Sequence, residues 1–203
     1  MTTIILGILG IAAVAVVLFF TYYAFNEKPL PWAKDKTAKQ AVGVSSALNT
    51  VQRWAKLNNT QVISSATLQS KNLSAYADAI LVGPFGVLGI KCLGLNGDIY
   101  GEKNDGAWLQ VVNDERISFE NPLTECNVCA RLIREALFAA GIKNTNVDCI
   151  AVFCNKKANI AVPRSAGIVF PHTLKDTLNK DKYTIDKGLD TQKAAEAIKT
   201  FIK

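Results

Sequence analysis

The sequence predicts a mixed α/β domain preceded by one transmembrane helix, and three observations support this prediction. An uncharged apolar run occupies residues 4–25 at the N-terminus. Short apolar runs bounded by turn residues follow in the rest of the chain, as is typical of buried strands. Apolar residues at helical spacing occur before, between and after these runs, so the domain is expected to combine both kinds of element.

The N-terminal run predicts a single-pass anchor in the cell membrane. At about 1.5 Å per residue, a helix over residues 4–25 extends roughly 33 Å, enough to cross a hydrocarbon core of about 30 Å. A cleaved signal peptide would begin with basic residues and have a shorter apolar core, whereas Met1-Thr2-Thr3 has no basic side chain. Lysines follow the run and none precedes it, so the positive-inside rule predicts an external N-terminus and a cytoplasmic C-terminal part. These lysines are Lys28, Lys34, Lys36 and Lys39.

Behind the anchor, the chain is expected to contain a short linker and one domain. Residues 1–26 belong to the anchor, residues 27–40 form a proline-containing juxtamembrane linker, and residues 41–203 have the length of one domain. The formal net charge of +6 is spread among interspersed acids, which favours a solvated surface over a strongly basic partner site. The five cysteines are odd in number, and in a reducing cytoplasm they predict no disulfide framework.

The first part of the domain contains one predicted helix and several predicted strands. Val44, Leu48 and Val51 recur at helical spacing, which predicts a helix over residues 38–57. Asn96-Gly97 is typical of a tight turn and predicts a hairpin into residues 98–101. The remaining apolar runs predict strands at residues 61–66, 76–82, 86–92 and 107–112.

A helix with clear boundary signals follows these strands. Asn121 suits the N-cap, Pro122 suits the first helical position, and Gly141 marks the end. The rest of the chain predicts strands at residues 147–154, 159–162 and 167–170, and helices at residues 172–180 and 191–202.

One ungapped stretch links these elements to a known family. The run DAILVGPFGVLGIKCLGLNGDI, from Asp78 to Ile99, is followed by Trp108, by NPL opening a helix, and by a strand containing CIAVF. This order of motifs resembles the nuclease-related domain (NERD) family over residues 40–175. The resemblance implies the core of the PD-(D/E)XK nuclease superfamily, which is a mixed central sheet flanked by helices, as in restriction endonucleases.

The resemblance also implies the position of an active site. The superfamily needs an aspartate at one strand end and Glu-x-Lys on the next strand, because alternate residues share a face. The acids bind Mg²⁺, which activates water for phosphodiester cleavage. Asp78 matches the aspartate, whereas Lys91 stands at the glutamate position and Leu93 at the lysine position. The glutamine expected on the following helix corresponds to Glu125.

These replacements predict a domain that has lost metal-dependent cleavage. The ammonium group of Lys91 would repel a cation at the expected metal position, so no metal is expected, and an ion pair with Asp78 would suit the vestigial site. The alternative is a membrane-tethered, Mg²⁺-dependent nuclease with relocated acids. Asp98, Glu102 and Asp105 are the candidates for that role.

The cysteines and the single histidine are expected to be structural. Cys126 and Cys129 share helical spacing with Ile133 and Leu137, which predicts an apolar stripe. Cys149 and Cys154 are expected to face opposite sides of a strand, about 16 Å apart, so four thiolates would not converge on zinc. His172, without a second histidine, is predicted to be a solvated residue at a helix start.

The function predicted from these observations is binding or scaffolding at the membrane. Replacement of an acid by Lys91 favours phosphate, so nucleic acid is one candidate ligand, and a protein partner is the other. Lys156, Lys157 and Arg164 are expected in loops, where they would contact phosphates nonspecifically or solvate strand ends.

Overall fold

The computed structural model describes residues 36–163 and 167–203, and it describes side chains from residue 43 onward. The segment from Gln40 to Lys203 forms one compact unit. The predicted anchor at residues 4–25 lies outside the described residues. Among the helices that the structure describes, none is long and apolar enough to cross a membrane.

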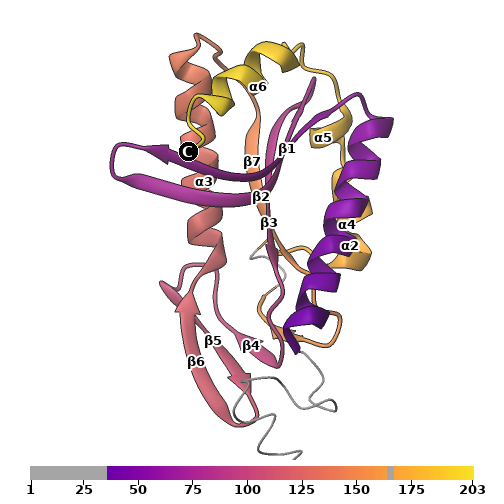
Figure 1. Ribbon diagram of the computed structural model, residues 1–203, viewed down its shortest axis with the longest axis vertical. Helices are drawn as coiled ribbons and strands as arrows, with labels where there is room; N and C mark the ends of the chain where they lie inside the picture. The colour runs from indigo at the N-terminus through magenta and orange to yellow at the C-terminus, as the bar shows by residue number, and fades with distance from the viewer. Residues whose placement is uncertain (1–35, 164–166) are drawn as a thin grey trace, which may run out of the picture. The chain divides into compact units, whose positions relative to one another are not determined.

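The first sheet has four strands in the order β1-β2-β3-β7 (Figure 1). The first three strands are antiparallel neighbours, and β7 pairs in parallel with β3. Because parallel pairing needs a crossover connection, α3 returns the chain from one side of the sheet to the start of β7. The strands are β1 (Gln61–Ser70), β2 (Leu73–Gly83), β3 (Gly86–Leu93) and β7 (Val147–Phe153).

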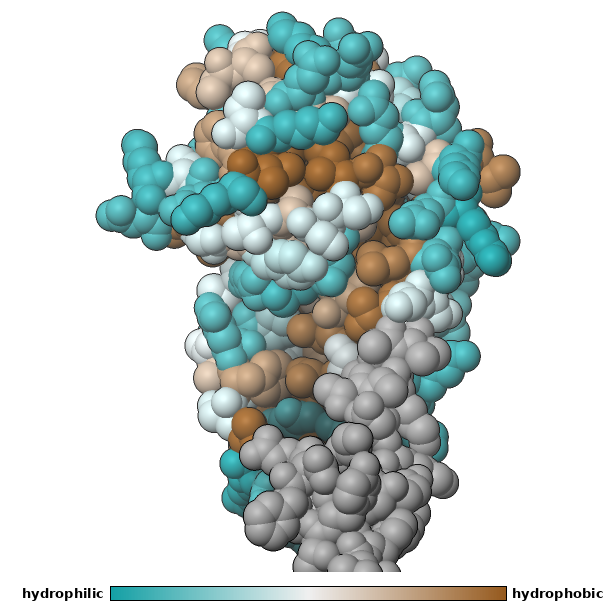
Figure 2. All heavy atoms as spheres, viewed as in Figure 1, coloured by the Kyte–Doolittle hydropathy of each residue, from teal (hydrophilic) through white to brown (hydrophobic). Residues whose placement is uncertain are grey.

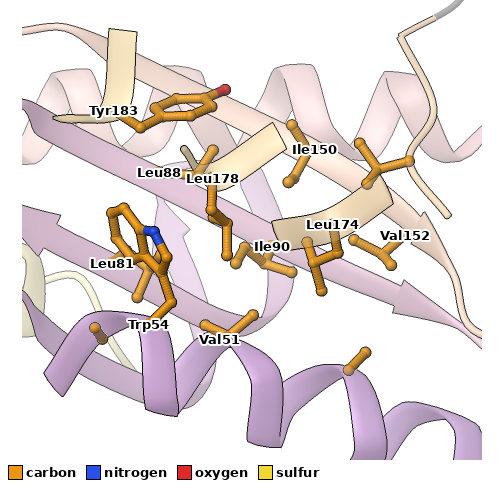
Figure 3. Close-up of a cluster of buried hydrophobic side chains, with 14 of the residues drawn as sticks. Val51, Trp54, Leu81, Leu88, Ile90, Ile150, Val152, Leu174, Leu178 and Tyr183 are labelled. Atoms are coloured by element: carbon orange, nitrogen blue, oxygen red, sulfur yellow. The ribbon is translucent and has the colours of Figure 1, made fainter. Parts of the chain in front are cut away.

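Helices cover both faces of this sheet. One face packs against α2 (Lys36–Leu57), α4 (Pro171–Leu178) and α5 (Asp181–Thr184). Figure 3 shows Val51 and Trp54 of α2 pointing toward Leu81 and Ile90 of the strands. The other face packs against α3 (Pro122–Ala139) and α6 (Thr191–Lys199). The two cores are separate apolar clusters, and β2, β3 and β7 contribute buried residues to both of them.

The second sheet has four strands in the order β6-β5-β4-β8. It has its own small core, in which Trp108 stacks on Phe153 at a centroid distance of 6.2 Å. Trp108 Nε1 donates a hydrogen bond of 2.9 Å to the carbonyl oxygen of Glu102. The strands are β4 (Asp98–Tyr100), β5 (Ala107–Val112), β6 (Glu115–Glu120) and β8 (Asn159–Ala161).

The prediction of a mixed α/β class, with a mixed sheet flanked by helices, is confirmed, and the structure adds a second sheet. The hairpin predicted at Asn96-Gly97 is wrong, because β3 pairs with β2 and β7 whereas β4 pairs with β5 and β8. Gly97 does turn the chain, with φ of 75°, but a Cβ there would lie 2.1 Å from the carbonyl oxygen of Val111. The turn therefore directs the chain onto β5 and away from β3.

Two further elements differ from the predictions. The predicted strand at residues 167–170 is reduced to one bridge between Val152 and Val169. The strand β6 and the short helix α5 were not predicted. The chain end adds to the first sheet, because Ile202 bridges Leu68 of β1 in antiparallel fashion.

Hydrophobic and hydrophilic side chains gather on different parts of the surface. Figure 2 shows exposed hydrophobic side chains gathered between α6 and the β1–β2 hairpin, with hydrophilic side chains around them. The protruding tip of the β1–β2 hairpin is hydrophilic, which suits a sheet end that extends into solvent (Figure 2).

Candidate functional site

The candidate site lies where β2 and β3 approach the N-terminal half of α3. Gly89 of β3 faces α3 closely, because a Cβ at this position would lie 3.2 Å from Cys129 Sγ. Alternate strand residues share a face, so Lys91 also points toward α3. The helix is fixed there by its N-cap, since Asn121 Oδ1 accepts a hydrogen bond of 2.9 Å from the N–H group of Leu123.

Lys91 and Glu125 form an ion pair at this point. The side chains are largely shielded from water, with exposed fractions of 15% for Lys91 and 28% for Glu125. Tyr76 completes the cluster, because its N–H group donates a 3.3 Å hydrogen bond to Glu125 Oε1 and its ring centroid lies 6.0 Å from Lys91 Nζ. Tyr76 was not predicted as a site residue, although its position two residues before Asp78 on the same strand was a usable signal.

Asp78 has a different partner. Its Oδ2 atom accepts a hydrogen bond of 2.7 Å from the N–H group of Cys92. Ala77 and Ala79 pack into the two different cores, although alternate strand residues normally share a face. The strand therefore changes face at Asp78, between the pairs Ser64–Ala79 and Ala66–Ala77, where Ser65 has φ of 52°.

The change of face separates Asp78 from the ion pair. Asp78 binds the N–H group of Cys92, whose side chain packs against the α2-side core, whereas Lys91 and Glu125 form their ion pair on the α3 side of the sheet. The expected ion pair between Lys91 and Asp78 is therefore wrong, and Glu125 is the carboxylate that neutralises Lys91.

The cysteines divide between the two faces. A hydrogen bond with Cys154, together with burial, raises the pKa of Cys92 on the α2 side. On the α3 side, hydrogen bonds with Cys126 and Cys129, together with burial, raise the pKa of Cys149. Both thiols therefore stay protonated at neutral pH.

The described residues do not assemble a metal site. Cys149 and Cys154 lie on opposite sides of the first sheet, as predicted from their spacing, so the four thiols considered for zinc do not converge on one point. Over residues 36–163 and 167–203, no group of three or more histidine, cysteine, aspartate or glutamate side chains is placed to hold a metal ion.

The residues at the family's metal position do not fit Mg²⁺. One carboxylate, Asp78, binds a backbone N–H group, and the other, Glu125, is neutralised by Lys91. A hard divalent cation needs several free oxygen ligands, and an ammonium group occupies this side of the strand. Of the acids suggested as replacements, Glu102 and Asp105 are exposed, and Asp105 Oδ2 accepts a hydrogen bond of 2.8 Å from the N–H group of Glu102.

The other described candidates lie on different segments of the chain from the ion pair. Lys156 and Lys157 are exposed in the turn after β7, and Arg164 lies outside the described residues. His172 is exposed near the start of α4, where its ring stacks on Phe170 at a centroid distance of 5.7 Å.

The fold and the cluster define a mixed α/β domain with a shielded Lys91–Glu125 ion pair between β3 and α3. The family model for the nuclease-related domain, NERD, matches residues 39–154, and the chain belongs to this family. Comparisons with curated proteins and with solved structures found no match.

Proposed function

We propose that this chain is a membrane-anchored nuclease-related domain that binds a ligand and does not cleave it. The observation that carries the proposal is the ion pair between Lys91 and Glu125. Two charges 4 Å apart interact by roughly 4 kcal/mol at an effective dielectric constant of 20. The ammonium group of Lys91 would therefore cancel the attraction of one carboxylate for a cation at the metal position, whereas a divalent cation needs several free anionic oxygen ligands.

The ion pair also limits how the domain can bind nucleic acid. Because Glu125 neutralises Lys91, this lysine offers no free charge to a phosphate group. Lys156 and Lys157 are adjacent and exposed, and no carboxylate of the described chain lies within ion-pair distance of either. We assign the phosphate contacts to these two lysines, together with Arg164 in the following segment.

The loss of cleavage is tested by thermal unfolding of the full chain in detergent, with and without Mn²⁺ or Mg²⁺. A ligand that binds only the native state raises the melting temperature, so the wild type and Asp78→Ala are expected to show no metal-dependent rise. A rise that is abolished in Asp78→Ala, together with metal-dependent cleavage of DNA or RNA, would establish the nuclease alternative.

The ligand is tested by binding of a fluorescent single-stranded oligonucleotide at several salt concentrations. Phosphate contacts release counterions, so affinity is expected to fall with salt, and the slope should decrease by about one for each lysine removed. Lys156→Gln combined with Lys157→Gln should weaken binding, whereas Lys91→Met should not. If the affinity changes neither with salt concentration nor in the double variant, nucleic acid is excluded as the ligand and a protein partner is favoured.

The membrane location rests on the apolar run at residues 4–25. We propose a single-pass anchor with an external N-terminus and a cytoplasmic domain. Protease added outside intact cells should then spare all of the chain beyond residue 26. Digestion of the domain from outside would show that the orientation is the opposite of the proposed one.

A further inference from the structure

Two adjoining pockets lie at the end of the first sheet that is opposite Lys91. The first, called here the lysine pocket, has a volume of about 310 Å³ and lies where β3 and β7 begin. The second, called the apolar pocket, has a volume of about 500 Å³ and lies beside the C-terminal half of α3. Residues 142–145 line both pockets and form their common wall.

The lysine pocket carries uncompensated positive charge. Lys143, Lys187 and Lys193 line it, and Asp190 is the one acid in its lining. Asp190 Oδ1 is engaged as the N-cap of α6, where it accepts a hydrogen bond of 3.0 Å from the N–H group of Lys193. Within the described part of the chain, no carboxylate lies within ion-pair distance of the three ammonium groups.

The backbone around the lysine pocket is held in place before any ligand binds. The N–H group of Lys187 donates a hydrogen bond of 2.9 Å to the carbonyl oxygen of Pro84. On the other side, the N–H group of Val87 donates one of 2.8 Å to the carbonyl oxygen of Asn146. Gly86 allows this close approach, because its φ is 131° and a Cβ there would lie 2.2 Å from the Asn146 oxygen.

The apolar pocket complements this charge with hydrophobic surface. Phe138 lines it and is 68% exposed, so its ring is available to a ligand. Apart from Lys143, the charged groups of this pocket already have partners, because Arg131 pairs with Glu135 and Arg134 Nη2 donates a 2.7 Å hydrogen bond to a backbone oxygen. Lys143 Nζ lies 5.9 Å from the Phe138 ring centroid and connects the two pockets.

We propose that the two pockets form one binding site for a small organic phosphate with an aromatic or apolar ring, which is the chemistry of a nucleotide. The phosphate group would lie among Lys143, Lys187 and Lys193, and the ring would lie against Phe138. Small-molecule sites commonly have volumes of about 300–1,000 Å³ with apolar walls and a few polar groups. This site is separate from Lys91, Lys156 and Lys157, so its test does not depend on the function proposed above.

The experiment measures the binding of AMP to the full chain in detergent by isothermal titration calorimetry. Inorganic phosphate and adenosine are titrated separately, because each carries one half of the proposed ligand. AMP is expected to bind at least about tenfold more tightly than either half. No AMP binding, or AMP binding no tighter than inorganic phosphate, would overturn the proposal.

Substitutions in the two pockets separate their contributions. Lys187→Gln combined with Lys193→Gln should weaken AMP and phosphate by at least about tenfold. Phe138→Ser should weaken AMP and adenosine but leave phosphate unchanged. Lys175→Gln combined with Lys180→Gln removes the same charge from exposed positions outside both pockets and should leave AMP binding unchanged. Equal loss in this control would show general charge attraction and would overturn the assigned site.

Discussion

At the scale of single residues, the main question is what holds Lys91 on a strand whose preceding residues are all buried. The five residues of β3 before Lys91 are buried, and the side chain of Lys91 itself is only 15% exposed. A shielded charge requires a partner, and removal of that partner leaves an unpaired charge in a poorly hydrated position. Glu125 therefore has a structural role that the nuclease site of the family does not explain.

A double-mutant cycle measures this role. Glu125→Gln keeps the acceptor for the N–H group of Tyr76 but leaves Lys91 unpaired, so we expect a loss of about 1–3 kcal/mol in the free energy of unfolding. Lys91→Met combined with Glu125→Gln should cost less than the sum of the two single changes, because the pair is then absent altogether. Urea unfolding of the four proteins gives the coupling energy. Additivity within about 0.5 kcal/mol would mean that the ion pair contributes nothing.

A second prediction at the scale of single residues concerns the packing of Gly89. A Cβ at this position would lie 3.0 Å from Cys149 Sγ and 3.2 Å from Cys129 Sγ, so Gly89→Ala must displace buried thiols. Overpacking of this kind should lower the free energy of unfolding by about 1–3 kcal/mol.

The matched control for Gly89 is Gly106→Ala. A Cβ at Gly106 meets no atom within 4 Å, so its effect should stay within about 0.5 kcal/mol. Urea unfolding measures both variants. If Gly89→Ala is as mild as Gly106→Ala, the thiols are not tightly packed against β3.

At the scale of elements, the start of α3 is the best-defined junction between the two sheets. Asn121 is only 1% exposed, and its Oδ1 atom caps the helix. Its Nδ2 group donates hydrogen bonds to the carbonyl oxygens of Lys103 and Asp105, at 3.1 and 2.7 Å. One side chain thus joins α3 to the loop between β4 and β5.

Removal of this side chain should cost more than the loss of an ordinary cap. Asn121→Ala loses the cap, worth about 1 kcal/mol, and also leaves two carbonyl oxygens without their donor, so we expect about 3 kcal/mol in total. Asp190→Ala removes the exposed cap of α6 and should cost only about 1 kcal/mol. Chemical unfolding compares the two. Equal costs would show that the Nδ2 hydrogen bonds add no stability.

Elements with local signals were predicted well from the sequence, and elements fixed by distant partners were not. The cap of α3 depends on Asn121 and Pro122, which are adjacent in the sequence, and the structure confirms both positions. The strand β6 was missed because most of its residues are exposed, so it shows no apolar alternation. Asn113 and Asp114 both have positive φ, and this pair was the available signal for the hairpin that β6 completes.

The candidate site shows the same limit. The sequence identified Lys91 and Glu125 as site residues, but their pairing depends on how α3 lies on β3. The change of face at Asp78 coincides with the positive φ of Ser65 on the neighbouring strand, and serine gives no strong signal for that conformation. The division into two sheets also depends on β8, which follows β7 in the chain yet pairs with β4.

At the scale of the whole molecule, Asp148 should contribute to the dependence of stability on pH. Burial acts to raise the pKa of Asp148, but hydrogen bonds from Lys182 and Tyr183, at 2.6 and 2.7 Å, lower it below the ordinary value overall. A carboxyl group with a lowered pKa in the folded state stabilises the protein at pH values above its unfolded pKa, which is about 3.9. That stabilisation is lost as pH falls through the lower folded value.

Asp148→Asn should remove this contribution. The difference in unfolding free energy between the wild type and the variant is expected to be constant above about pH 5 and to shrink as pH falls below about 4. Urea unfolding at a series of pH values measures the difference. A constant difference down to strongly acidic pH would mean that the charge of Asp148 does not stabilise the fold.

The placement of the tryptophans makes the two cores optically distinguishable. Trp54 lies between α2 and the first sheet, edge-on to Phe85 at a centroid distance of 6.1 Å, whereas Trp108 lies in the core of the second sheet against Phe153. The chain has a third tryptophan, Trp32, so the experiment starts from Trp32→Phe. In that background, replacing either Trp54 or Trp108 with phenylalanine leaves the emission of the other as a reporter of its own core. Fluorescence of the two variants during unfolding would therefore show whether the two sheets melt together or one after the other.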